Sequence, residues 1–129
     1  MKFPTNIKIF GDVKFRDKKC PPESNEQITL FNWLRVSGYV TAIHPRNEGK
    51  RSYRQVNRQK AEGMTPGAAD IIIPGNPTFV CELKRKDHTL CRWEPDQIEY
   101  LQQCQKDGAF VCIALGHAAA IEAVKKWKN

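Results

Sequence analysis

The chain has 129 residues, 40% hydrophobic and 27% charged, which excludes a disordered chain and indicates one globular domain over residues 1–129. No apolar run approaches the roughly 18 residues of a membrane span, and the first residues lack the apolar core of a signal peptide, so we expect a cytoplasmic protein. The formal net charge of +7 and the pI of about 9.3 favour a polyanionic partner.

The first half of the chain predicts a hairpin, a helix and a strand. Weak alternation over residues 3–15, around a Gly-Asp pair, indicates a short hairpin. A capping box from Ser24 to Gln27 predicts a helix that ends near Ser37. The residues 39–43 that follow are rich in β-formers and predict a strand.

The second half begins with a basic segment, residues 44–62, that has too few apolar residues for a core element. The remaining elements are predicted in chain order as strands at 69–73 and 78–84, a helix from about 93 to 107, a strand at 109–115 and a helix at about 117–127. Pro95 is tolerated only in the first turn of a helix, which places that helix start near Trp93 or Glu94. This order predicts an α/β fold with a mixed sheet flanked by helices.

The five cysteines argue for a reducing environment. No Cys-x-x-Cys pair is present, and Cys81, Cys104 and Cys112 lie within apolar patterns, as small buried residues do. The spacing of Cys20 and Cys91 relative to the histidines is unlike that of a zinc site.

Two carboxylates and a lysine are predicted to converge at one end of the sheet. Glu82 and Lys84 are two residues apart in one strand, so their side chains share a face. Asp70 begins the preceding strand, and pairing of the two strands would bring it beside Glu82. The alternative is that these are solvated strand ends with a surface ion pair worth about 0–1 kcal/mol.

If these side chains converge, they have the composition of a divalent-metal centre. Mg²⁺ or Mn²⁺ prefers hard oxygen ligands, here Asp70, Glu82 and the backbone carbonyl of Leu83. Lys84 could orient a water molecule or neutralise developing charge. Gln97, on the inner stripe of the next helix, and Glu26, on the inner side of the first helix, are further candidates, Glu26 also as a metal ligand.

The order of these residues resembles the PD-(D/E)xK nuclease superfamily and, more narrowly, the VRR-NUC family, the virus-type replication-repair nuclease domain. The resemblance spans about residues 23–116 and leaves residues 1–20 as an N-terminal extension. The residues that carry it are Glu26, Gly67-x-x-Asp70, Glu82-Leu83-Lys84 and Gln97, together with His44-Pro-Arg-Asn-Glu-Gly49 and Gly63-Met-Thr-Pro-Gly67.

The resemblance implies a restriction-endonuclease-like core and metal-dependent hydrolysis of DNA, with Asp70, Glu82 and Lys84 as the catalytic centre and Glu26 and Gln97 in support. The chain is similar to stand-alone viral or phage members, which implies a homodimer in a bacterial or phage-infected cell that resolves branched DNA such as a Holliday junction during repair. Two alternatives stay open: a duplex nuclease or nickase of repair or restriction type, and a DNA-binding module without catalysis.

The basic segment 44–62 is a candidate DNA-binding arm. It carries six basic and two acidic side chains, a net charge of +4. Guanidinium groups suit phosphates, and an aromatic ring can stack on a base. The candidate DNA contacts are Arg46, Lys50, Arg51, Tyr53, Arg54, Arg58 and Lys60. A solvated helix face or loop is the alternative reading of the same charges.

Overall fold

The computed structural model describes residue 3 and residues 6–45 and 52–129. Its elements follow the chain as β1 (Lys8–Phe10), α1 (Glu23–Val36), α2 (Tyr53–Ala61), β2 (Ile71–Ile73), β3 (Phe79–Lys84), the 3₁₀ turn η1 (His88–Leu90), α3 (Pro95–Lys106), β4 (Phe110–Leu115) and α4 (His117–Lys128). None of the helices in these ranges combines the length and the apolar character needed to cross a membrane.

The four strands form one mixed sheet in the order β1-β4-β3-β2. The two central strands, β3 and β4, run parallel, and β1 adds to β4 in parallel. At the other edge β2 pairs antiparallel with β3, so that Ile71 lies opposite Cys81. The mixed sheet flanked by helices confirms the predicted α/β fold class.

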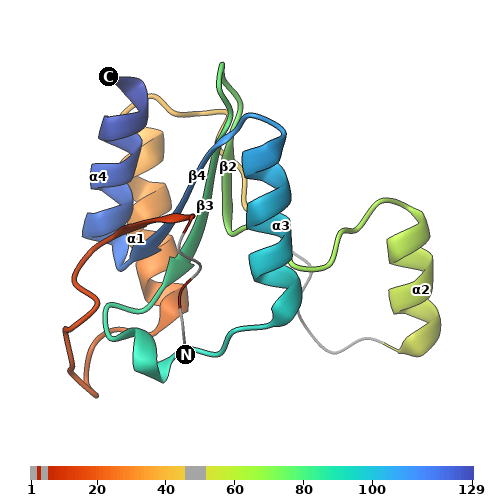
Figure 1. Cartoon of the computed structure of the whole chain (residues 1–129), viewed down its shortest axis with the longest axis horizontal. Helices are drawn as coiled ribbons and strands as arrows, with labels where there is room; N and C mark the ends of the chain where they lie inside the picture. Colours follow the sequence, from red (N-terminus) through yellow and green to blue (C-terminus); the bar gives the residue numbers. More distant parts are fainter. Residues whose placement is uncertain (1–2, 4–5, 46–51) are drawn as a thin grey trace.

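The sheet is covered on both faces, as Figure 1 shows, with α1 and α4 on one side and α3 on the other. Along β3, Phe79, Cys81 and Leu83 belong to the core beneath α1 and α4. Val80 belongs instead to the core beneath α3, where it meets Leu101. Because side chains alternate along a strand, Glu82 and Lys84 extend from the same face as Val80, at the end of β3.

The predicted N-terminal hairpin and the predicted strand at 39–43 are both wrong. β1 takes its hydrogen bonds from the distant strand β4 rather than from a neighbouring segment. Between 39 and 43, only Ile43 makes a β-bridge, to Ile72. Tyr39 follows the C-terminal end of α1 and packs against that helix. Its N–H donates to the carbonyl oxygen of Leu34, and its ring stacks on that of Trp33 with the centroids 5.8 Å apart.

The predicted capping box of the first helix is also wrong. The residue before α1 is Pro22, which makes no side-chain capping bond, and Ser24 lies inside the helix. The amide of Gln27 points away from the helix start and lies 3.5 Å from the carbonyl oxygen of Asp70. The helix therefore begins two residues earlier than the capping box predicts, which puts Glu23 in its first turn.

Helix α2 extends away from the body of the molecule (Figure 1). None of its residues is buried, in agreement with the prediction that the basic segment builds no core. Its start is held locally by a capping box: Ser52 Oγ accepts from the Gln55 N–H at 3.2 Å, and Gln55 Oε1 accepts from the Ser52 N–H at 2.9 Å.

Candidate metal centre

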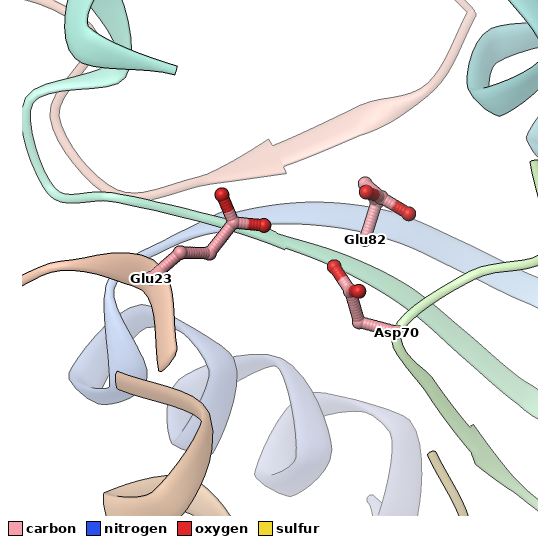
Figure 2. A group of neighbouring side chains, drawn as sticks. All are labelled: Glu23, Asp70 and Glu82. Carbon is pink, nitrogen blue, oxygen red and sulfur yellow. The ribbon is translucent and has the colours of Figure 1, made fainter. Parts of the chain in front are cut away.

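Three carboxylates meet at the end of β3. Glu23 comes from the first turn of α1, Asp70 immediately precedes β2, and Glu82 lies in β3, with one oxygen of each within 4.8 Å of the others. Figure 2 shows the three side chains pointing toward one another. The pairing of Ile71 with Cys81 explains the approach, because it places Asp70 next to Glu82 across the two strands. We call these three carboxylates the acidic cluster.

Asp70 is held in place through both its side chain and its backbone. Its Oδ2 accepts a hydrogen bond from the Leu83 N–H at 2.9 Å. Its carbonyl oxygen lies 2.7 Å from His44 Nδ1. These contacts fix the direction of the carboxylate before any ligand binds, which is the preorganisation that a binding site needs.

Burial disfavours the charged forms of Asp70 and Glu82 unless a cation lies beside them. Burial raises the pKa of Glu82 well above its ordinary value, and the nearby charge of Asp70 raises it further. Burial also raises the pKa of Asp70, against the hydrogen bond from Leu83. Glu82 Oε1 is buried and has no hydrogen-bond partner in the described part of the chain. A hard carboxylate oxygen that lacks a hydrogen-bond partner, as Glu82 Oε1 does, fits a bound Mg²⁺ or Mn²⁺.

The ammonium of Lys84 is buried beside the cluster, in a residue that is 1% exposed. Its Nζ lies 3.5 Å from Glu82 Oε2 and donates to the carbonyl of Arg92 at 3.0 Å and to Gln97 Oε1 at 3.3 Å. The ring of Trp93 covers it, with the centroid 4.2 Å from Nζ. One cation is therefore held at a defined place against the acids.

The start of α3 positions Gln97. The helix begins at Pro95 with Glu94 as its N-cap, which confirms the start predicted from the proline. Gln97 Oε1 accepts from the Glu94 N–H at 3.0 Å as well as from Lys84. The capping geometry of the helix thus orients the amide that contacts the lysine.

Comparison with known proteins identifies the architecture. No family model and no curated protein matches the sequence. A solved structure described as a VRR_NUC domain protein matches with a TM-score of 0.70 and 19% sequence identity, over 84% of this chain and 89% of that chain. The chain has the fold of a VRR_NUC domain protein. The resemblance inferred from Gly67-x-x-Asp70 and Glu82-Leu-Lys84 is confirmed at the level of the fold.

Within this VRR_NUC fold, Glu26 lies apart from the acidic cluster. It is 5% exposed and its Oε2 accepts from the backbone N–H of His117, with His117 Nδ1 at 3.1 Å. It therefore caps the start of α4, a helix whose own N-cap residue, Gly116, has no side chain to do so. The structure places Glu23, one turn earlier, where the sequence analysis expected Glu26.

Sequence reasoning missed Glu23, and it did not connect His44 with Asp70 or Trp93 with Lys84. A signal for Glu23 was present, because an acid directly after Pro21-Pro22 begins the first turn. The position of His44 depends on its contact with Asp70, and that of Trp93 on its contact with Lys84. Neither contact follows from local sequence.

The VRR_NUC fold leaves two hollows at the acidic cluster. One, of about 540 Å³, is lined by Gln27, Ile28 and His44 beside Glu23 and Asp70. The other, of about 330 Å³, lies between α2 and the start of α3. Its lining includes Lys60 and Met64 from the α2 side and Asp96 and Gln97 from the α3 side, with Asp70 at its border.

The candidate DNA contacts divide into two groups. Tyr53, Arg54, Arg58 and Lys60 are exposed on α2, and Lys60 reaches the hollow that borders Asp70. Arg46, Lys50 and Arg51 lie outside the described residues.

Proposed function

We propose that the protein is a metal-dependent DNA endonuclease. The observation that carries this proposal is the acidic cluster, with oxygens within 4.8 Å of one another, beside the buried ammonium of Lys84 in a VRR_NUC-type fold. A surface ion pair does not need three acids within 4.8 Å of one another. A carboxylate oxygen without a hydrogen-bond partner, such as Glu82 Oε1, is costly to bury. A metal-assisted reaction on a phosphodiester accounts for both features.

Glu23, Asp70 and Glu82, with the backbone carbonyl of Leu83, would hold Mg²⁺ or Mn²⁺. When bound, such an ion supplies an activated water and stabilises negative charge on phosphate oxygens. The hydrogen bond from the Leu83 N–H keeps Asp70 directed into the site. Glu26 is left out of this ligand set, since its carboxylate is engaged by His117.

Lys84 and Gln97 would act on the reacting phosphate together. Arg92 and Gln97 accept two of the three N–H groups of the Lys84 ammonium. The remaining donor is on the side of Glu82, where a phosphate oxygen or the attacking water can accept it. Gln97 fixes the ammonium, so its role is to position Lys84 as well as to contact water or phosphate.

The proposal extends to the substrate and the assembly. The exposed basic residues of α2 would follow the DNA backbone next to the site. A homodimer that acts on branched DNA, such as a Holliday junction in repair, is supported by the resemblance of the motifs around Asp70 and Glu82 to stand-alone viral members. The free cysteines among the described residues suit a reducing cytoplasm.

The test is cleavage of a labelled four-way junction beside a linear duplex of the same sequence, with Mg²⁺, with Mn²⁺ and with EDTA. Asp70→Ala is the inactive control. We expect metal-dependent cleavage of the junction that falls by about 10²–10³-fold in the variant, the scale of loss when a catalytic electrostatic group is removed.

Cleavage of the junction alone supports the branched substrate. Equal cleavage of both DNAs keeps the nuclease and replaces the branched substrate with a duplex. DNA binding without cleavage under any condition would overturn the enzyme and leave a DNA-binding module.

A further inference from the structure

Two segments distant in sequence form one surface next to the acidic cluster. The first, residues 11–22, runs directly into Glu23. The second, residues 85–92, follows Lys84 and includes η1. We call this surface the basic platform. Both of its segments are thus joined by a peptide bond to a residue of the candidate site.

Side-chain contacts tie the two segments together. The Arg85 guanidinium donates to the carbonyl oxygens of Cys20 and Pro21, the latter at 3.1 Å. Asp87, which is buried, accepts from the Asp17 N–H at 2.9 Å. These bonds hold the backbones of the two segments against each other.

Ring contacts complete the attachment. Lys86 Nζ lies 4.5 Å from the centroid of the Phe15 ring. His88 Nε2 lies 3.0 Å from the carbonyl oxygen of Val13. The second segment is therefore in contact with residues along most of the first.

The acids of the platform are used to build its loops. Asp12 Oδ1 accepts from the Lys14 N–H at 2.9 Å, and Asp17 Oδ1 accepts from the Lys19 N–H at 2.9 Å. Asp87 accepts from the Thr89 N–H and hydroxyl in addition to Asp17. Backbone N–H groups thus engage all three carboxylates.

The basic side chains of the platform face solvent. Those of Lys14, Arg16, Lys18, Lys19, Lys86 and Arg92 are exposed. Within the described part of the chain, Lys14, Lys18 and Lys19 make no side-chain ion pair or hydrogen bond that would neutralise them. These three ammonium groups are free to contact an anion.

The charge of the chain is concentrated around the site. The platform carries seven basic and three acidic side chains, a formal net charge of +4. The basic segment 44–62 carries another +4, so the rest of the chain sums to −1. In Figure 1 the platform lies at the lower left and α2 at the far right, with the end of β3 between them.

We propose that the basic platform binds backbone phosphates of the DNA on the side of the acidic cluster away from α2. This inference rests on the proposed function for the identity of the polyanion. The substrate then has DNA backbone on both sides of the cleaved bond, held by α2 on one side and by the platform on the other.

The test compares two triple variants that remove the same charge. One is Lys14→Gln, Lys18→Gln, Lys19→Gln on the platform. The control is Lys106→Gln, Lys125→Gln, Lys126→Gln, exposed lysines near the C-terminal ends of α3 and α4. Binding to a labelled junction and a labelled duplex is measured in EDTA over a range of salt, so that cleavage does not contribute.

We expect the platform variant to lower the slope of log Kd against log salt by about 2–3, since each phosphate contact contributes about 0.9. The control should lower it by less than about 1. Equal slopes for the two variants, or no DNA binding by the unmodified protein, would overturn the platform. Cleavage by the unmodified protein is scored separately, so the nuclease can stand where the platform fails, and the platform can stand where the nuclease fails.

Discussion

Glu82 is the residue of the candidate site whose charge is costly to bury. Its side chain is 1% exposed, and its Oε1 lacks a hydrogen-bond partner within the described ranges. An ion pair with Lys84 at 3.5 Å offsets only part of the cost of burying the charge. The raised pKa of Glu82 means that folding without metal and ionisation of this carboxylate oppose each other.

This opposition predicts how stability without metal depends on pH. The folded pKa of Glu82 is raised above 4.5, so the folded state holds a proton that the unfolded state releases. The stability that this carboxyl group contributes is therefore fully present below pH 4.5, its ordinary pKa. It is lost as the pH rises through the folded pKa. In EDTA, the Tm of the unmodified protein should fall between pH 5 and pH 8 by this mechanism, whereas Glu82→Gln should change less and be the more stable protein at pH 8.

Glu94→Gln is the matched control, because Glu94 is half-exposed and pairs with Arg92 at the surface. It should follow the unmodified protein across the whole pH range. Adding Mg²⁺ at pH 8 should raise the Tm of the unmodified protein and leave that of Glu82→Gln nearly unchanged. Parallel Tm profiles for the unmodified protein and Glu82→Gln would contradict the account of this buried carboxylate.

At the scale of elements, α1 serves two purposes through acids one turn apart. Glu23 projects into the acidic cluster, and Glu26 caps the start of α4 through His117. The sequence predicts the right helix and an acid on its inner side, but its pattern pointed to Glu26 for the site. The assignment depends on where α4 begins relative to α1, and α4 lies some ninety residues further along the chain.

Two isosteric substitutions separate these roles. Glu26→Gln removes a buried charge from a helix N-terminus and should lower the free energy of unfolding by about 1–2 kcal/mol. Glu23→Gln should leave that free energy within about 0.5 kcal/mol, yet weaken Mg²⁺ binding roughly 10–100-fold. Chemical denaturation and metal titration by calorimetry measure the two effects. The reverse pattern would return Glu26 to the metal site.

At the scale of the whole molecule, the positive charge is gathered in two separate regions. The platform and α2 lie apart across the molecule (Figure 1), and the net charge of the chain resides in those two regions. Helix α2 has no buried residue, so packing gives it little stability of its own. Contact with a polyanion would stabilise both regions and explain why so much positive charge is gathered there.

Removal of charge from α2 should add to removal of charge from the platform. Arg54→Gln with Arg58→Gln should lower the salt slope of DNA binding by about 2. Combined with the platform variant, the decreases should sum, because distant sites that share no partner are independent. Lys125→Gln with Lys126→Gln is the control of equal charge. A combined slope no lower than that of either variant alone would show that one region does not contact DNA.

The features that the sequence alone determined are those that depend on interactions between residues close together in the chain. The start of α3 at Pro95, the strands before and after the Pro-Gly-Asn-Pro turn and the pair Glu82-x-Lys84 on one face all follow from interactions within a few residues. Separately, the resemblance of the motifs around Asp70 to the VRR-NUC family predicted the fold.

The tertiary structure decided which distant segments meet. Strand β1 pairs with the edge of β4. Glu23, and not Glu26, lies beside Asp70. Residues 11–22 contact residues 85–92. The physical reason is the same in each case. A strand edge, a helix N-terminus or a buried carboxylate can be satisfied by any suitable group that packing brings near, and packing across the chain is a property of the whole fold.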